Sequence, residues 1–403
     1  KKKNRDLEDV TTNSLLSKNK KNNIINKKYK NEIKYFYHEY LKNREAISSL
    51  KRCSLCILTE KMPFIIFDQY GVCNYCKNYR PQKIRGLNKL QDLFKTSKND
   101  LDCLVTLSGG RDSSFGLHVI KKILGLNPIA YTYDWGMVTD LARRNQMRMC
   151  GKLGVEHILV SADIIKKRQS IKKNVSAWLK KPTLGMVPLF MAGDKQYFYW
   201  SNRIAKQSKL KKIIMSENLL ETTKFKSGFT GIKPTFGTEN TYTLTLRNKF
   251  EMLFYYSKKF IENPAYLNTS LLDTFSGFLS YYALEHNYIN LFDYIKWDEI
   301  EINNTLINEY NWETSKDSNS TWRIGDGTAS FYNYIYYTIA GLTENDTFRS
   351  NQIRENQMSR NDALELSIKD NTPQFENINW YLNTIELDFV KTLKVINNAK
   401  KLY

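Results

Sequence analysis

The stretch Leu107–Ser114, which reads Leu-Ser-Gly-Gly-Arg-Asp-Ser-Ser, constrains the fold more than any other part of the chain. The apolar run from Cys103 to Leu107 comes before it and predicts a buried strand. The run Ser113–Leu124, with apolar residues at helical spacing, comes after it and predicts a helix. A glycine turn between a strand and a helix brings backbone N–H groups and the positive end of the helix dipole together. The sequence therefore predicts an anion site at this turn.

The turn offers backbone amides, hydroxyls and one carboxylate as ligands. No Gly-Lys-Ser/Thr follows the glycines, so this is not a Walker loop. The residues resemble the PP-loop, Ser-Gly-Gly-x-Asp-Ser, of the ATP pyrophosphatase superfamily, whose members cleave ATP between the α and β phosphates. The alternative is an ordinary serine- and glycine-rich turn. In the nucleotide interpretation the phosphate ligands are Ser108, Gly109, Gly110, Ser113 and Ser114, and Asp112 holds magnesium or pyrophosphate or caps the helix.

Strands and helices alternate after Leu101, which predicts an α/β fold with a parallel twisted sheet. Further strands are expected at Pro128–Tyr133, His157–Val160 and Lys211–Met215, with helical stretches between them. Ligands of such sheets lie at the carboxyl ends of the strands. This rule draws attention to polar residues that follow the predicted strands.

Four such residues are candidates for the site. Asp134 follows the second strand and is expected to contact the nucleoside. Glu217 follows a later strand, Lys195 lies in the helical region before that strand, and Lys226 lies in a basic, glycine-rich loop after it. We expect these last three to stabilise charge and contact the second substrate. The alternative for each is an ordinary surface charge.

Four cysteines form two Cys-x-x-Cys pairs, Cys53/Cys56 and Cys73/Cys76, separated by sixteen residues. This spacing is typical of a zinc ribbon, in which four thiolates close the tetrahedron and the metal is structural. An iron–sulfur cluster and free thiols are the alternatives. The remaining Cys103 and Cys150 fall inside predicted elements and are expected to be buried.

Length and charge predict several segments with different surroundings. The 403 residues carry a net charge of +20, but residues 263–403 hold 11 Lys/Arg against 19 Asp/Glu, so the basic excess lies before them. We expect a basic extension at 1–50, a zinc ribbon at 51–82, a PP-loop ATP-binding domain at 83–262 and a helical C-terminal region at 263–403. No apolar run is long enough to cross a bilayer, which predicts a cytoplasmic protein without a membrane span.

Two polar stretches of the C-terminal region have open interpretations. Thr321–Thr328 is a glycine turn before an aromatic helix expected at Ala329–Ile339, and is either a helix cap or a loop folded over the site. Arg349 and Arg354 lie close together, suited to a phosphate or carboxylate, or are solvated helix charges.

The order of these features is similar to that of the bacterial N-acetyl sugar amidotransferase family, used in making surface polysaccharides such as lipopolysaccharide. The resemblance covers residues 51–403 and includes Leu184–Lys195, Ser216–Asn218, Phe225–Ile232 and Trp322–Arg354. It implies that ATP adenylates the acetamido oxygen of a free or nucleotide-linked N-acetyl sugar and that ammonia then displaces AMP. It also implies Mg²⁺, and a separate glutaminase subunit as the ammonia source, since the chain shows no glutaminase signature.

Two other functions fit part of the pattern. A tRNA-thiolating PP-loop enzyme would share the zinc ribbon and the basic charge, but such enzymes usually carry further catalytic cysteines, so nucleic acid is an unlikely partner. A non-catalytic nucleotide-binding scaffold would keep the pocket without turnover.

Overall fold

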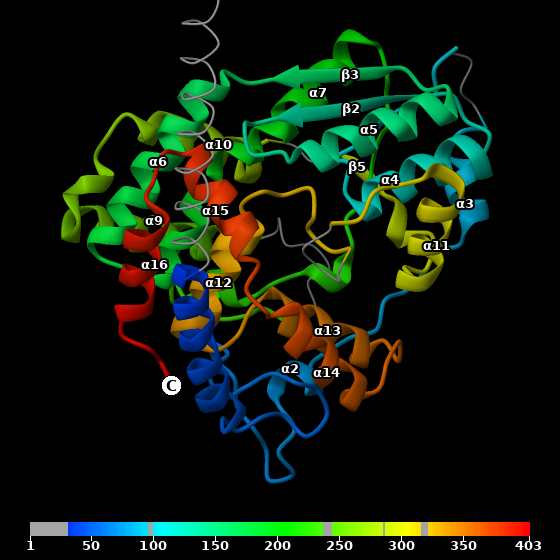
Figure 1. Ribbon diagram of the computed structural model, residues 1–403. Coiled ribbons are helices and arrows are strands. Elements are labelled where there is room, and N and C mark those ends of the chain that lie inside the picture. The colour runs from blue at the N-terminus through cyan, green and yellow to red at the C-terminus, as the bar shows by residue number, and fades with distance from the viewer. Residues whose placement is uncertain (1–30, 96–99, 237–243, 285–286, 316–320) are drawn as a thin grey trace, which may run out of the picture. The chain divides into compact units, whose positions relative to one another are not determined.

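The computed structural model describes residues 31–95, 100–236, 244–284, 287–315 and 321–403 (Figure 1). The chain divides into two compact units, Lys1–Ser49 and Leu50–Tyr403. In the first unit residues 31–48 are helical.

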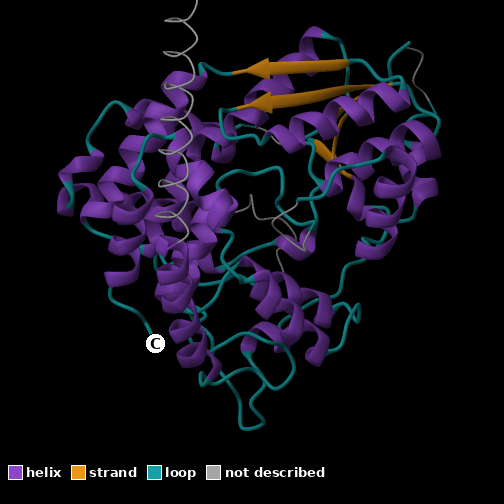
Figure 2. Ribbon diagram, viewed as in Figure 1, coloured by secondary structure: helices purple, strands orange, loops and turns teal. Residues whose placement is uncertain are grey.

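Five parallel strands form one sheet in the order β3-β2-β1-β4-β5, and the two long orange arrows of Figure 2 are its neighbouring strands β3 and β2. Their bounds are β1 Cys103–Thr106, β2 Pro128–Asp134, β3 His157–Ser161, β4 Ile213–Met215 and β5 Tyr288–Asn290. The α/β prediction is confirmed, and the first four strands lie within a residue or two of their expected ranges. Because every strand runs in the same direction, all the carboxyl ends meet at one edge.

Burial along the strands follows their place in the sheet. All seven residues of β2 are buried, and β1 is buried except for Thr106. β3 lies at an edge and has no fully buried residue. β5 was not predicted and lies in the stretch expected to be helical. Its three residues are too few to show the alternation that marks a strand.

Helices connect the strands. The helix expected at Ser113–Leu124 begins at Arg111, and its last turn is a π-helix at Val119–Ile123. The residues Met186–Gln207 were expected to form one helical stretch, but a 3₁₀ segment, Leu184–Gln196, comes before the α-helix Tyr197–Gln207. The helices in this part are α3 Leu87–Asp92, α4 Arg111–His118, α5 Asp140–Leu153, α6 Ile164–Lys180, α7 Tyr197–Gln207 and α8 Phe225–Gly228.

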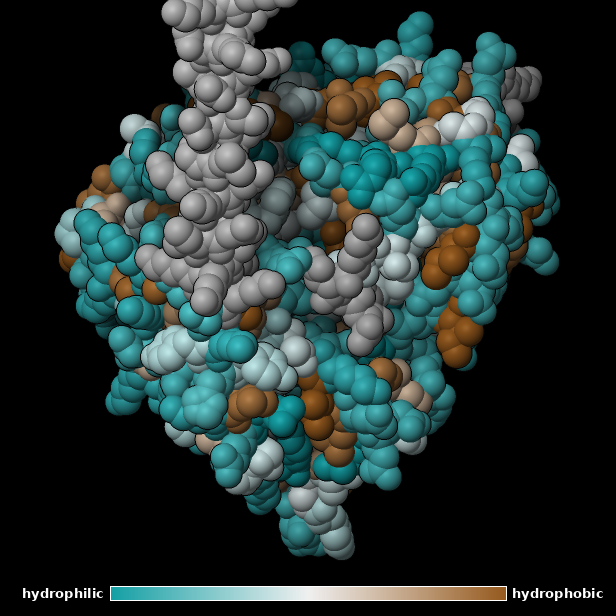
Figure 3. All heavy atoms as spheres, viewed as in Figure 1, coloured by the Kyte–Doolittle hydropathy of each residue, from teal (hydrophilic) through white to brown (hydrophobic). Residues whose placement is uncertain are grey.

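The C-terminal part is largely helical, as predicted. Its helices are α9 Leu246–Glu262, α10 Ser270–Tyr282, α11 Glu299–Tyr310, α12 Ala329–Ala340, α13 Glu344–Arg354, α14 Arg360–Asp370, α15 Phe375–Thr384 and α16 Phe389–Asn398. On the face drawn in Figure 3 most side chains are hydrophilic, with apolar ones in scattered patches. Among the described residues, no helix combines the length and apolarity that a membrane crossing requires.

Candidate functional site

The turn between β1 and α4 has the backbone that its glycines predict. Gly109 adopts a positive φ of 80°, and a Cβ there would collide with the Ala142 carbonyl, whose carbon would lie only 2.9 Å away. Gly110 is the N-cap residue of α4 and provides no side-chain cap. The first N–H groups of a helix have no partner within the helix, so this end of α4 can donate to an anion.

The serine side chains of the turn close on one another. Ser108 Oγ lies 2.9 Å from Ser113 Oγ and accepts a hydrogen bond from Gly110 N at 3.3 Å. Ser113 Oγ accepts from Ser108 N at 3.1 Å. A phosphate bound at the turn would replace these local hydrogen bonds with hydrogen bonds to its own oxygens. Ser114 is fully buried behind the turn, and its Oγ has no hydrogen-bond partner.

A cavity of about 700 Å³ opens at the carboxyl ends of the strands and reaches this turn. It brings together most of the residues that the sequence singled out. Those lining it are Ser108, Gly110, Asp112, Ser113, Lys195, Glu217 and Lys226. Gly109 shapes the turn without lining the cavity. Asp134 does not line it either.

Asp134 is buried and its carboxylate is occupied by the protein. Arg143 donates to Oδ2 through Nε at 3.0 Å and Nη2 at 2.7 Å, and Gly136 N donates to Oδ1 at 2.9 Å. The carboxylate therefore fixes the loop after β2. A contact with a nucleoside remains a prediction for this residue.

The segment after β4 presents polar groups to the cavity. β5 holds Glu217 in place: Asn290 Oδ1 accepts from Glu217 N at 2.9 Å, and Asn290 Nδ2 donates to its carbonyl at 3.0 Å. On either side, Ser216 and Asn218 line the cavity, but Ser216 Oγ and Asn218 Nδ2 are themselves buried without a hydrogen-bond partner. Ser216 Oγ packs against Gly116 of α4.

Arg111, the variable position of the motif, organises the charges beside the turn. Its buried guanidinium donates to Asp112 at 3.1 Å, Glu221 at 3.3 Å and Glu299 at 3.0 Å. It also lies over the ring of Trp297, whose Nε1 donates to the same Asp112 oxygen at 2.9 Å. Asp112 is thus held in one orientation. The role of Arg111 could not be predicted from the motif, because the motif leaves this position free.

Glu221 is a second acidic group on the cavity wall that sequence reasoning missed. Burial and the neighbouring Asp112 carboxylate raise the pKa of Glu221 to about 8, although Arg323 and Arg111 act in the opposite direction. Glu221 therefore takes up a proton more readily than an ordinary glutamate side chain. Its position four residues after Glu217 is the only sequence feature that could have drawn attention to it.

Lys226 is paired with Glu344, the first residue of α13. Tyr332 donates to the other oxygen of Glu344 at 2.8 Å, and Arg323 lies 3.6 Å from it. Burial raises the pKa of Glu344, but Lys226 and Arg323 outweigh it and hold that pKa at about 2. Lys195 lies 5.2 Å from the ring centroid of Tyr281 and pairs with Asp194.

The glycine turn before α12 lies against the PP-loop-like turn. A Cβ at Gly325 would be in ordinary van der Waals contact with Gly110 N, at 3.6 Å, and the Gly325 carbonyl accepts from Thr139 N at 3.3 Å. Asp326 also accepts from the backbone N–H of Thr328 at 2.9 Å. The segment lines the cavity through Trp322, Arg323 and Asp326. The helix-cap interpretation is not supported, because α12 has no side-chain cap at its N-cap residue Thr328.

Arg349 and Arg354 do not form one anion site. Arg349 is buried and donates to Glu299 at 2.7 Å and to Asp370 at 2.9 Å. Arg354 faces the cysteine cluster. The carboxylates that Arg349 was expected to attract are therefore supplied by the protein itself.

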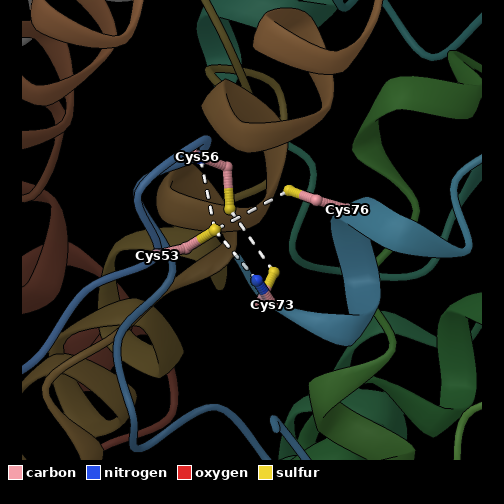
Figure 4. Close-up of side chains that lie close together, drawn as sticks. All are labelled: Cys53, Cys56, Cys73 and Cys76. Atoms are coloured by element: carbon pink, nitrogen blue, oxygen red, sulfur yellow. Dashed lines mark hydrogen bonds between the residues drawn. The ribbon is translucent and has the colours of Figure 1, made fainter. Parts of the chain in front are cut away.

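The four cysteines meet in one cluster, with their sulfurs pointing toward one another (Figure 4). All four Sγ atoms lie within 4.8 Å of each other, and Cys53–Cys76 and Cys56–Cys73 are each 3.9 Å apart. Tetrahedral zinc with Zn–S bonds of about 2.3 Å requires S···S distances of about 3.8 Å. The cluster therefore fits a closed, structural Cys₄ zinc site. Cys103 and Cys150 are buried elsewhere, as expected.

The comparisons with known proteins give little beyond this geometry. No family model matches the chain, and no curated protein matches it. One similar solved structure is an NH3-dependent NAD synthetase from Campylobacter jejuni subsp. jejuni NCTC 11168 in complex with the nitrate ion, at 14% identity. The match covers 50% of this chain and 95% of that chain, with a TM-score of 0.25. A similarity this slight carries no argument about activity.

Proposed function

We propose that the chain is an ATP-dependent, AMP-forming amidotransferase that converts the acetamido group of an N-acetyl sugar into an acetamidino group. The observation that carries the ATP-dependent part is one cavity that joins the helix start at Gly110 to Lys195, Glu217 and Lys226. The residues Ser216 and Asn218 after β4 also line this cavity. The sugar and the amidine product rest on the family resemblance of the sequence.

The reaction needs two displacements. The amide oxygen attacks the α-phosphorus of ATP, the bond to the β-phosphate oxygen breaks, and pyrophosphate leaves with its electron pair. Ammonia then adds to the activated carbon, and AMP leaves with the former amide oxygen. One proton is lost in each half, so the products are pyrophosphate, AMP and the amidine.

The residues of the cavity meet the electrostatic demands of these steps. Backbone N–H groups at Gly110 and the start of α4 would hold the departing pyrophosphate, and Lys195 would offset its charge. Mg²⁺, when bound, would neutralise phosphate charge, and its preference for oxygen ligands fits the carboxylate of Asp112. Glu217 and Lys226 would orient the sugar. The four-cysteine cluster would hold structural zinc, away from the chemistry.

The decisive experiment incubates the protein with ATP, Mg²⁺, ammonium and a panel of free and nucleotide-linked N-acetyl sugars. We expect pyrophosphate release that depends on the sugar, and a product about one mass unit lighter, because NH replaces O. Asp112→Ala should abolish both signals, while the matched control Asp92→Ala, an exposed acid that pairs with Lys95, should keep them. Full activity in Asp112→Ala would refute the assignment of the site.

Sulfur transfer to tRNA is disfavoured by the positions of the cysteines. Over the part of the chain that the structure describes, no cysteine lines the cavity. Binding of tRNA measured over a salt series would test this alternative, because phosphate contacts give a steep salt dependence. A scaffold that binds ATP without turnover would give no pyrophosphate with any sugar of the panel.

A further inference from the structure

Arg354, the last residue of α13, contacts the cysteine cluster directly. Its Nε lies 3.3 Å from Cys76 Sγ, and its Nη2 lies 3.3 Å from Cys56 Sγ. One guanidinium therefore donates to one sulfur of each Cys-x-x-Cys pair. An ammonium group lacks the planar, forked arrangement of donors by which the guanidinium contacts both sulfurs.

The charge of a loaded Cys₄ site explains why a cation belongs here. Four thiolates around a divalent metal carry a net charge of −2, and Arg354 would neutralise half of it through charge-assisted hydrogen bonds. The third nitrogen of the guanidinium donates to Asn351 Oδ1 at 2.7 Å, within the same helix. The metal cluster and α13 are thus connected through one side chain.

The same helix reaches the walls of the cavity. Asn351 Nδ2 donates to the Leu220 carbonyl at 2.7 Å, next to Glu221. Two residues earlier in α13, Arg349 shares Glu299 with Arg111, the residue that orients Asp112. At its first residue, α13 supplies Glu344 to Lys226.

We infer that the metal cluster positions the nucleotide cavity through α13, with Arg354 as the positioning residue between them. Two cysteine sulfurs hold the C-terminal end of α13 through Arg354. Other residues of α13 contact the cavity wall. Arg354 touches no substrate in this scheme. The inference rests on the proposed function only in its consequence for ATP, because the seating of the helix can be measured without ATP.

The test is amide hydrogen exchange of the full zinc-loaded chain, compared with Arg354→Gln, with zinc content measured on the same samples. We expect exchange of peptides covering 344–354 and 219–221 to become about tenfold faster in the variant, the scale of losing one charge-assisted hydrogen bond. ATP affinity should fall in parallel. Unchanged exchange in 219–221 would overturn the inference, whether the variant keeps its zinc or loses it.

Two further variants separate seating of the helix from general destabilisation. Arg354→Lys keeps the charge but loses the fork, so we expect it to retain zinc and to restore part of the protection. Arg360→Gln is the matched control, because Arg360 donates to the carbonyls of Cys53 and Cys56 from α14 rather than to their sulfurs. If Arg360→Gln loosens 219–221 as much as Arg354→Gln does, α13 has no special role. If the wild-type chain binds no ATP, the proposed function fails, yet the exchange data still decide this inference.

Discussion

Replacing Glu344 by glutamine tests whether the buried charges beside the cavity are a stabilising unit. The Glu344 side chain is 1% exposed, and it balances Lys226 and Arg323 while accepting a hydrogen bond from Tyr332. Glutamine has nearly the same size, so the change removes charge without creating a cavity. The two cations would then remain in a poorly solvated place without their counter-ion.

Two estimates of the cost agree. Removing one partner of a buried ion pair typically costs about 3–5 kcal/mol. The pKa of Glu344 is lowered from an ordinary 4.5 to about 2. At 1.36 kcal/mol per pKa unit this difference corresponds to ~3.4 kcal/mol of folding free energy. We therefore expect Glu344→Gln to lose about 3 kcal/mol at pH 7.

The lowered pKa of Glu344 also predicts how the stability difference between wild type and variant changes with pH. Because the folded-state pKa is depressed, the stabilisation by Glu344 is fully present above pH 4.5 and is lost as the pH falls toward 2. Urea unfolding followed by tryptophan fluorescence should therefore show wild type and variant converging between pH 4.5 and 3. Glu386→Gln, which removes an exposed pair with Lys172, is the control and should change nothing measurable. A difference that is small at pH 7, or constant down to pH 3, would refute the reasoning.

Three other changes test the site independently. Gly109→Ala should abolish measurable ATP binding, because a left-handed φ costs an L-residue about 1–2 kcal/mol and the new Cβ would also collide with the Ala142 carbonyl. The control is Gly151, a helical glycine with open space where a Cβ would lie. Gly151→Ala should stabilise the fold by about 0.8 kcal/mol. ATP affinity should fall as the pH rises through about 8, because Glu221 then ionises beside Asp112 and its charge repels phosphate, although Arg111 and Arg323 oppose this repulsion. Glu221→Gln should make the ATP affinity nearly independent of pH in this range. Chelating the metal should lower the apparent Tm and release one zinc per chain, and Cys76→Ser should lower the Tm in the same way.

The sheet and the turn could be predicted from the sequence because local signals specify them. Leu107–Ser114 carries its backbone requirement in its own glycines, and Gly109 adopts the left-handed conformation that only glycine reaches at low cost. β1 and β2 lie in short, mostly apolar runs between turn residues, so the hydrophobic pattern locates them. β5 is different: its three residues form a strand only because β4 lies beside them.

The complete site could not be predicted, because its supporting residues come from segments far apart in the chain. Arg111 is surrounded by Glu221, Glu299 and Trp297, none of which is near it in sequence. Glu344 meets Lys226 across more than a hundred residues. Sequence spacing locates groups that share a turn or a helix, whereas ion pairs between distant segments depend on the packing of the whole unit.

The rule that ligands lie at the carboxyl ends of parallel strands identifies the position of Asp134 but leaves its role open. The carboxyl end of β2 does lie at the edge of the sheet that faces the cavity, as topology requires. The side chain nevertheless turns to Arg143 and the Gly136 amide, because a buried carboxylate takes the nearest donors. The residues of this loop that line the cavity are Trp135 and Val138.

The charges that line the cavity also bear on how ATP would be recognised. Six cationic and six acidic side chains line it, so the cavity itself has no large positive excess, although the first 262 residues of the chain do. A tetra-anionic nucleotide cannot be held there by net charge alone. It would need donors at fixed positions, such as the N–H groups at the start of α4, and a neighbouring Glu221 whose pKa is raised would repel it less than an ordinary carboxylate. Recognition by such donors would require a rigid wall, which the buried ion pairs of Arg111 and Glu344 would provide.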